Sequence, residues 1–166
     1  MTFLDLPQGS HVFLDANTLI YHFTVHRTFG AACSDLLRRI EKGEVVAHAS
    51  THVVAELMHK LMTVEAVKQF GWTQGKVTLR LRQHPDAAKQ LNEFRVALTK
   101  LHNLPMHILP IPSPLLDDAA TINRQTGLLT NDALVVAVMQ AQGLANLASN
   151  DADFDRVPSI HRYAPV

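Results

Sequence analysis

Long hydrophobic runs and paired cysteines are both missing from this sequence of 166 residues. The single cysteine, Cys33, excludes an internal disulfide and fits a reducing compartment such as the cytoplasm. No apolar stretch approaches the roughly 18 residues that a transmembrane helix needs. The N-terminal segment also lacks the basic flank and apolar core of a signal peptide. We therefore expect a cytoplasmic protein without a membrane segment.

An excess of charge is missing as well, because 15 Lys and Arg residues balance 15 Asp and Glu residues. This balance argues against a protein that coats nucleic acid through its overall field. With 47% hydrophobic and 18% charged residues, the composition is that of a globular protein. The length suits one hydrophobic core, so we expect a single domain over residues 1–166.

The charges are segregated along the chain although they cancel overall. Residues 68–102 contain seven basic residues and two acidic ones, whereas residues 117–155 contain six aspartates and one arginine. The first segment favours contact with a polyanion, and the second favours cations. Solvated surface charge is the alternative interpretation of both segments.

Short apolar runs alternate with stretches of helical periodicity. Five runs predict strands, the last of them at a sheet edge: 12–14, 45–47, 108–111, 146–149 and 160–163. Helices are predicted at 31–42, from 50–51 to 61, and at 114–125 and 132–142. This alternation predicts an α/β protein with a three-layer α/β/α arrangement and a mostly parallel central sheet.

The segment 62–104 departs from that alternation. It predicts two helices, with interruptions near Gly71-Trp72 and at His84-Pro85. We interpret this segment as a helical insertion or arm.

Four acidic residues occupy special points of this pattern. Asp15 directly follows the first predicted strand, and Asp151 lies just after the fourth. Parallel strands bring their carboxyl ends to one edge, so these two side chains should share it. Asp132 stands in the first turn of an apolar helix, and Glu56 stands within an apolar helical stretch where a buried acid would need a partner. Asp15 could equally serve as a helix N-cap.

Four acids at one edge would repel one another and raise some of their pKa values unless a cation were bound. Oxygen ligands favour Mg²⁺ or Mn²⁺ over zinc. One or two such ions would lower the pKa of a bound water and neutralise a scissile phosphate. The sequence therefore predicts a divalent-metal site.

The segments around these acids resemble the PIN domain family, and most of all its VapC-type ribonuclease toxins of prokaryotic toxin–antitoxin pairs. The matching stretches are FLDANTLIY, VVAEL, TNDALVVA and ASNDADF, which span nearly the whole chain in the order found in the family. The resemblance implies a PIN-like fold and a Mg²⁺- or Mn²⁺-dependent endoribonuclease that cleaves RNA and often forms a homodimer. It assigns metal binding and water activation to the acidic quartet: Asp15, Glu56, Asp132 and Asp151.

The resemblance extends to three neighbouring positions. Asn17 matches a polar position that hydrogen-bonds within the site, and Ser149 matches a small hydroxyl residue that orients a carboxylate or a water. Asp153 could assist at the metal site, or could cap the turn before Phe154. If the chain is a toxin, a small antitoxin protein should inhibit it with a charged residue that reaches this edge.

The long basic segment between Glu56 and residue 108 is where the chain departs from the compact family pattern. It could grip RNA phosphates, with Arg80 and Arg82 as candidates, or it could form a dimer surface. Trp72 could stack on a base, but an isolated tryptophan more often serves as a buried or interface anchor.

Two alternative chemistries use other residues. His52, Glu56 and His59 lie at i, i+4 and i+7 of one predicted helix and could bind zinc. Cys33 could act as a nucleophile, but no histidine motif accompanies it, which favours a core thiol.

Two alternative functions use the same acids. A haloacid-dehalogenase-like phosphohydrolase also begins with an apolar strand and an Asp-x-Asp-x-Thr motif, but here Asn17 replaces the second acid. The basic residue that such enzymes use is not evident either. A non-catalytic PIN-like interaction module with vestigial acids is the other alternative.

Overall fold

Five parallel strands form the central sheet of the computed structural model, which describes residues 1–166. The strand order is β3-β2-β1-β4-β5, and every neighbouring pair is parallel. The strands are β1 (His11–Leu14), β2 (Val46–Ser50), β3 (Met106–Leu109), β4 (Asn146–Ala148) and β5 (His161–Tyr163). The order reverses between β1 and β4, so the carboxyl ends of these two strands open a crevice.

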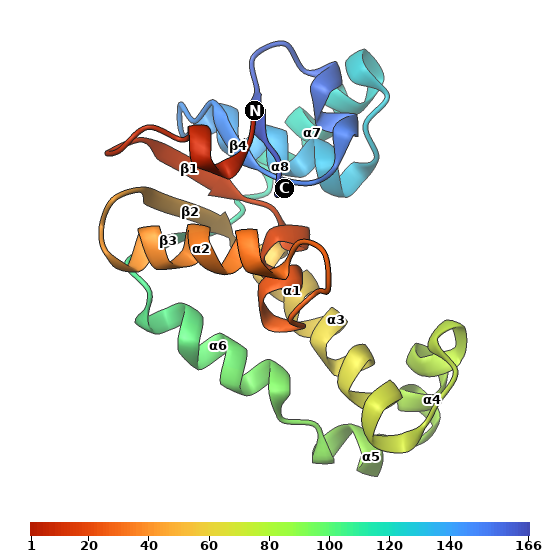
Figure 1. Ribbon diagram of the computed structural model, residues 1–166. Helices are drawn as coiled ribbons and strands as arrows, with labels where there is room; N and C mark the ends of the chain where they lie inside the picture. Colours follow the sequence, from red (N-terminus) through yellow and green to blue (C-terminus); the bar gives the residue numbers. More distant parts are fainter.

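Helices cover both faces of the sheet, which gives the predicted three-layer α/β/α arrangement (Figure 1). One side carries α1 (Ala16–Phe23), α2 (Gly30–Glu41), α3 (Thr51–Phe70) and α6 (Glu93–Asn103). The other side carries α7 (Pro114–Thr126) and α8 (Thr130–Ala141). Two 3₁₀ turns, η1 (Phe3–Asp5) and η3 (Ala152–Arg156), complete this part. None of the helices has the length and apolar character that crossing a membrane requires.

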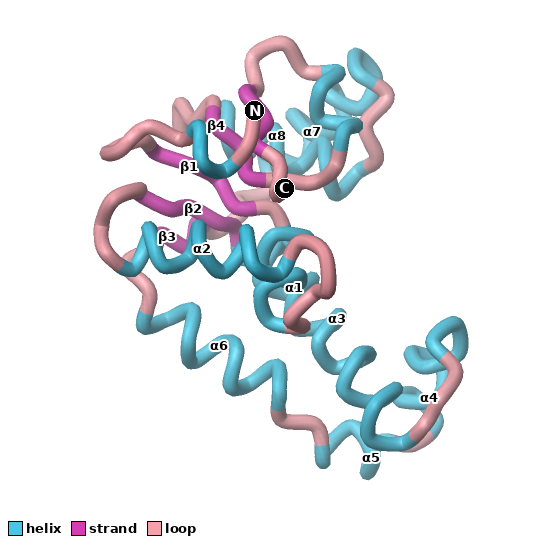
Figure 2. Tube along the Cα trace, viewed as in Figure 1, coloured by secondary structure: helices cyan, strands magenta, loops and turns pink.

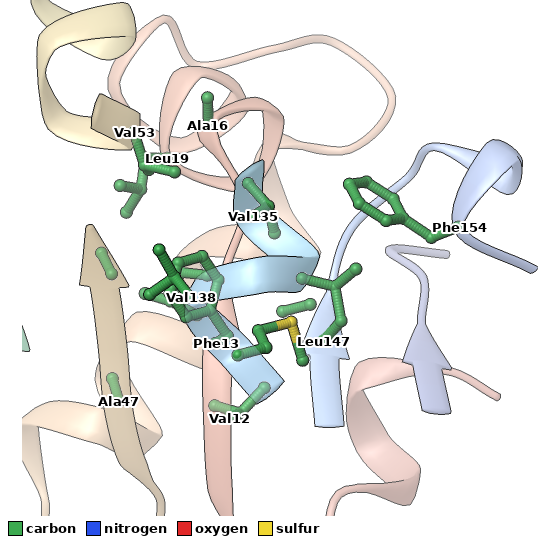
Figure 3. Packing of buried hydrophobic residues seen from close by; sticks show 14 of the residues in the cluster. Val12, Phe13, Ala16, Leu19, Ala47, Val53, Val135, Val138, Leu147 and Phe154 are labelled. Atoms are coloured by element: carbon green, nitrogen blue, oxygen red, sulfur yellow. The ribbon is translucent and has the colours of Figure 1, made fainter. Parts of the chain in front are cut away.

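The hydrophobic core is centred on β1 and α8. Val12, Phe13 and Leu14 of β1 are fully buried, and so are Val136 and Met139 of α8. Figure 3 shows core side chains gathered between the sheet and α8. Burying one side chain of this size contributes about 1.5–3 kcal/mol, so β1 is fixed in the centre of the sheet.

Local signals in the sequence set several helix ends. The Ser50 hydroxyl accepts a hydrogen bond from the Val53 N–H at 3.2 Å and caps the start of α3. Gly127 has a φ of 73° and ends α7 in the left-handed conformation that favours glycine. Helix α8 begins at Thr130, two residues earlier than predicted, and no side chain caps it.

The arm, residues 62–104, differs from its prediction. Helix α3 continues without a break to Phe70, because no glycine or proline occurs between Leu61 and Gly71. After it come a 3₁₀ turn and three helices instead of two: η2 (Gln74–Lys76), α4 (Val77–Gln83), α5 (Pro85–Gln90) and α6. Figure 2 shows that this part of the chain contains only helices and loops.

Strand β3 also lies two residues earlier than its prediction at 108–111. Pro110 and Pro112 follow it, and proline has no N–H to extend the hydrogen-bond ladder of a parallel strand. The edge position predicted for 160–163 is confirmed by β5, which pairs with β4 alone.

Candidate metal-binding active site

A cavity of about 610 Å³ opens at the carboxyl edge of the sheet, beside the crevice between β1 and β4. It gathers residues from four distant parts of the sequence. All four predicted acids line it, together with six other residues: Asp15, Asn17, Ile20, Glu56, Leu129, Thr130, Asn131, Asp132, Val135 and Asp151. The fold therefore brings the predicted quartet to one place.

Asp15 serves both as the predicted helix cap and as a cavity residue. It is the N-cap of α1, and its Oδ1 accepts a hydrogen bond from the Ala16 N–H at 2.6 Å. Its Oδ2 accepts hydrogen bonds from the side-chain amide of Asn17 and, at 2.7 Å, from the Ser149 hydroxyl. Burial raises the pKa of Asp15 to about 6; the Ser149 and Ala16 hydrogen bonds oppose this shift, and the charges of Glu56 and Asp132 add to it.

Asp132 is the second acid whose ionisation is disfavoured. It is half-buried in the first turn of α8. Burial raises its pKa above the usual value, and the neighbouring charges of Asp151, Glu56 and Asp153 raise it further. The cavity therefore concentrates negative charge that a bound cation would relieve.

Glu56 and Asp151 complete the quartet in different surroundings. Glu56 and its neighbour Ala55 are exposed, so the sequence interpretation of Glu56 as a buried acid was wrong. The reason is that this position of α3 faces the open cavity and not the core. Asp151 is the N-cap of η3, and its Oδ1 accepts a hydrogen bond from the Asp153 N–H at 2.9 Å.

Ser149 lies behind the cavity and does not line it. Its side chain is fully buried, and its hydroxyl oxygen accepts hydrogen bonds at 3.0 Å from the Asp151 N–H and from the Asn17 side chain. With the bond that it donates to Asp15, Ser149 fixes two acids relative to each other. It is thus a positioning residue that has no contact with the cavity.

Asn17 does line the cavity, and its orientation is fixed. Its Oδ1 accepts a hydrogen bond from the Asn150 N–H at 3.1 Å, which aims its amide nitrogen at Asp15 and Ser149. Its neighbour Thr18, fully buried, donates a hydrogen bond to the Ala148 carbonyl at 2.8 Å. These bonds join the start of α1 to the end of β4.

Asp153 stands apart from the cavity. It forms an ion pair with Arg156 at 2.8 Å and is absent from the cavity lining. The prediction that Asp153 caps the turn before Phe154 was wrong, because Asp151 is the cap of η3 and the side chain of Asp153 pairs with Arg156 instead.

Five cavity residues were not predicted from the sequence: the apolar Ile20 and Val135, and the three residues 129–131 directly before Asp132. Leu129 is 73% exposed at the rim, and Thr130 and Asn131 line the wall without capping α8. The signal that could have found them is a polar pair directly before an acid that begins an apolar helix.

The donor set of the cavity fits a hard divalent cation. Carboxylate and amide oxygens line it, and burial, with a further contribution from the neighbouring acids, raises the pKa values of Asp15 and Asp132, so that a bound cation would favour their ionised forms. As the side chains stand, no three His, Cys, Asp or Glu residues of the chain converge closely enough to hold one ion. One or two of these carboxylates with bound waters would suffice for Mg²⁺, which usually keeps several waters.

The alternative sites have no support in the structure. His52 and His59 do not line the cavity, and with Glu56 they form no group able to hold zinc. Burial raises the pKa of the fully buried Cys33 thiol to about 12, which leaves it inert as a nucleophile.

Comparison with known proteins gave a family match and a set of similar folds. The model of the PIN domain family matches residues 12–160, which is most of the chain. No curated protein matches the sequence.

Several solved structures share the fold at low sequence identity. VapC20 from Mycobacterium tuberculosis, described as a sarcin–ricin loop cleaving toxin, has a TM-score of 0.63 at 15% identity, over 89% of this chain and 95% of its own. VapBC2 from Rickettsia felis, solved bound to a DNA fragment from its promoter, has a TM-score of 0.61 at 16% identity, over 94% of this chain and 99% of its own. A toxin–antitoxin complex from Klebsiella pneumoniae has a TM-score of 0.55 at 18% identity, over 90% of this chain and 95% of the matched chain. At these identities the similarity establishes the fold.

Proposed function

This chain belongs to the PIN domain family, and on that premise we propose that it is a metal-dependent endoribonuclease, the toxin of a type II toxin–antitoxin pair. One observation carries the proposal. Asp15 and Asp151 follow the two strands between which the sheet order reverses, and Glu56 and Asp132 meet them in one cavity.

The four carboxylates have separate tasks in the proposed hydrolysis of an RNA phosphodiester. Asp15, Asp132 and Asp151, the less exposed three, would hold Mg²⁺ or Mn²⁺. When bound, the ion lowers the pKa of a water and neutralises charge on the scissile phosphate. Glu56 faces solvent at the open side of the cavity, where it can accept the proton of the attacking water.

Asn17 and Ser149 act on Asp15. Their hydrogen bonds to Asp15 Oδ2 occupy one carboxylate oxygen and fix the orientation of the group. Because these bonds already fix its side chain, Asp15 loses little conformational entropy when it binds a ligand. Neighbouring residues of this kind raise the affinity of a metal site by orienting its ligands.

The proposal includes partners. Similarity in fold to VapC20, VapBC2 and the Klebsiella complex supports RNA as the substrate and a small antitoxin as the inhibitor. An antitoxin would place a charged side chain at the mouth of the cavity. A homodimer and a cytoplasmic location, where Cys33 stays reduced, complete the proposal.

RNA cleavage by the wild type and by a variant that lacks one acid of the quartet tests the proposed chemistry. We expect wild-type protein to cut RNA with Mg²⁺ or Mn²⁺ and to stop when EDTA is added. Asp132→Asn should lower kcat about 100-fold or more, because it removes a ligand charge worth several kcal/mol in the transition state. The exposed acid Asp118 in α7 gives the matched control, and Asp118→Asn should cleave at the wild-type rate.

Other outcomes separate the alternative functions. Wild-type cleavage by purified Asp132→Asn would contradict the assignment of the quartet. Turnover of p-nitrophenyl phosphate without RNA cleavage would favour the haloacid-dehalogenase-like alternative. Absence of both activities, in protein that binds no Mn²⁺ in equilibrium dialysis, would favour a non-catalytic interaction module. Analytical ultracentrifugation tests the homodimer, and co-purification with the product of a neighbouring small gene tests the antitoxin.

A further inference from the structure

A second charged region, residues 68–102, begins at the end of α3 that is farther from the carboxylate cavity and returns alongside α3 as α6. Glu56 at the cavity and Phe70 at the end of α3 are separated by fourteen residues of continuous helix, about 21 Å at 1.5 Å per residue. Helices α4 and α5 lie beyond that end and away from the sheet (Figure 1). The cavity and the tip of the arm are therefore joined by one continuous helix.

The cations of this region are largely free of acidic partners. Both acids between residues 68 and 102 are paired, Glu93 with Lys68 at 3.8 Å and Asp86 with Lys89 at 2.8 Å. The five remaining cations form no ion pair and are exposed: Lys76, Arg80, Arg82, Arg95 and Lys100. Unpaired exposed cations on one segment attract a polyanion and release its counterions on binding.

Aromatic side chains are interleaved with these cations. Trp72 is half-buried, and its ring lies 4.9 Å from the ring of Phe70 and 6.0 Å from that of His84. The guanidinium carbon of Arg80 lies 5.7 Å from the centre of the Trp72 ring. Trp72 packs against the small cluster of Ala66, Val77 and Leu91, which agrees with its interpretation as an anchor, yet part of the indole stays open to solvent.

The arm is held in shape by its own contacts. The carboxylate of Glu65, only 9% exposed, accepts hydrogen bonds from the Asn92 N–H at 2.9 Å and 3.0 Å and from the Glu93 N–H at 2.8 Å. These bonds cap α6 and connect it to α3. A surface fixed in this way loses little entropy on binding a ligand.

Resting on the proposed ribonuclease function, we propose that the arm is a second binding site for the RNA substrate. Arg80 and Arg82 would contact the phosphates of a single-stranded segment, and the rings of Trp72 and His84 would stack against its bases. The observations favour RNA over an anionic membrane, because Leu79 and Val96 are the only large apolar side chains that the arm exposes. Membrane association needs a broader apolar face.

Fluorescence gives a direct test, because Trp72 is the only tryptophan in the chain. The test uses metal-free full-length Asp132→Asn protein, titrated with a 12-nucleotide single-stranded RNA and followed by tryptophan emission and by anisotropy of a labelled RNA. We expect the emission to be quenched in parallel with binding. The same RNA as a blunt duplex should quench it less.

Variants test the two kinds of contact separately. Arg80→Gln with Arg82→Gln should raise Kd about 10-fold or more at low salt, and should reduce the slope of log K against log salt by about 0.7 for each cation removed. Trp72→Leu should weaken binding about fivefold, because a stacked base is lost. Lys42→Gln, which removes an exposed and unpaired lysine at the end of α2, should leave Kd and slope unchanged.

The inference is overturned if RNA binds with no change in Trp72 emission and the Arg80 and Arg82 variant retains Kd and slope. It is also overturned if the emission changes with protein concentration alone, which would make the arm an interface between copies, or if only phosphatidylglycerol vesicles change it. Cleavage by the wild type is measured separately. If the wild type cleaves RNA but neither the Trp72 emission nor the arginine variant responds, the second site is refuted and the proposed function stands. If the emission and the variant respond but RNA is not cleaved, the proposed function is refuted and the binding site stands.

Discussion

The carboxylate cavity and the arm carry opposite charges, and they are assembled in opposite ways. The cavity draws Asp15, Glu56, Asp132 and Asp151 from distant parts of the sequence, and the strand order of the sheet brings them together. The arm is continuous in sequence, and its cations remain on the surface around a small local cluster. Burying like charges raises the pKa values of Asp15 and Asp132 at the cavity, whereas the arm cations are exposed to solvent.

This contrast explains why the two regions should tolerate change differently. In the cavity, hydrogen bonds from Asn17 and Ser149 hold a carboxylate whose ionised form is costly. In the arm, each cation can act independently in solvent, and one buried acid, Glu65, fixes the backbone. A substitution in one region should therefore leave the other intact, and the following experiments test that separation.

Removal of the Ser149 hydroxyl should affect only the cavity. Ser149→Ala takes away the hydrogen bond to Asp15 and leaves the Asp151 N–H without its acceptor. Loss of such supporting bonds typically costs 10–100-fold in metal affinity or activity, and we expect a loss in that range. Mn²⁺ affinity and RNA cleavage measure it. Ser159→Ala, at an exposed position, is the control, and unchanged Mn²⁺ affinity in Ser149→Ala would contradict the positioning role.

Weakening the Glu65 cap should affect only the arm. Glu65→Gln replaces a carboxylate that accepts three backbone hydrogen bonds, and a lost cap costs about 1 kcal/mol. Amide exchange should then be about fivefold faster near Asn92 and Glu93, with no change in β1. Hydrogen–deuterium exchange measures both segments, and Glu41→Gln on the surface of α2 is the control. Faster exchange in β1 as well would show that the two regions are coupled.

Three histidines form a row across the sheet that assembles the cavity. Rings of His11, His48 and His107 stack across β1, β2 and β3, with centroids 5.1 Å and 5.0 Å apart. His48 Nε2 lies 2.9 Å from His11 Nδ1, and its Nδ1 is buried without a partner. Burial, then His107 and His11, lower the pKa of His48 to about 4.

The sign of the expected pH effect follows from that depressed pKa. Below the ordinary value of 6.5 the unfolded chain binds a proton that folded His48 resists, so stability is lost as the pH falls from 6.5 towards about 4. His48→Gln should remove this part of the loss. The fall in Tm between pH 7 and pH 4.5 should therefore be smaller than in the wild type by about a few degrees, since about 1 kcal/mol shifts the Tm of a chain of this size by a few degrees. Thermal melts at pH 7 and pH 4.5 measure it. His102→Gln, at an exposed position of α6, should follow the wild type; an identical pH response of His48→Gln would refute the assignment.

The sequence by itself predicted the three-layer fold, the strand after which Asp15 stands, and the four acids of the cavity. These features are local: a buried strand appears in the sequence as a short apolar run, and an acid at its end can be recognised as the next residue. The resemblance to the PIN domain family added the hypothesis that the four acids bind a metal ion together. The helix count of the arm was wrong, because ends without a strong breaker depend on packing that sequence periodicity does not contain.

Only the tertiary structure decided how each side chain is used. It placed Ser149 behind the cavity, turned Glu56 towards solvent, paired Asp153 with Arg156, and made Asn131 part of the wall. It also showed Glu65 as the cap of α6, a contact across 27 residues of sequence. Strand order and long-range hydrogen bonds set these roles, and both depend on which segments meet in space and not on any local pattern of residues.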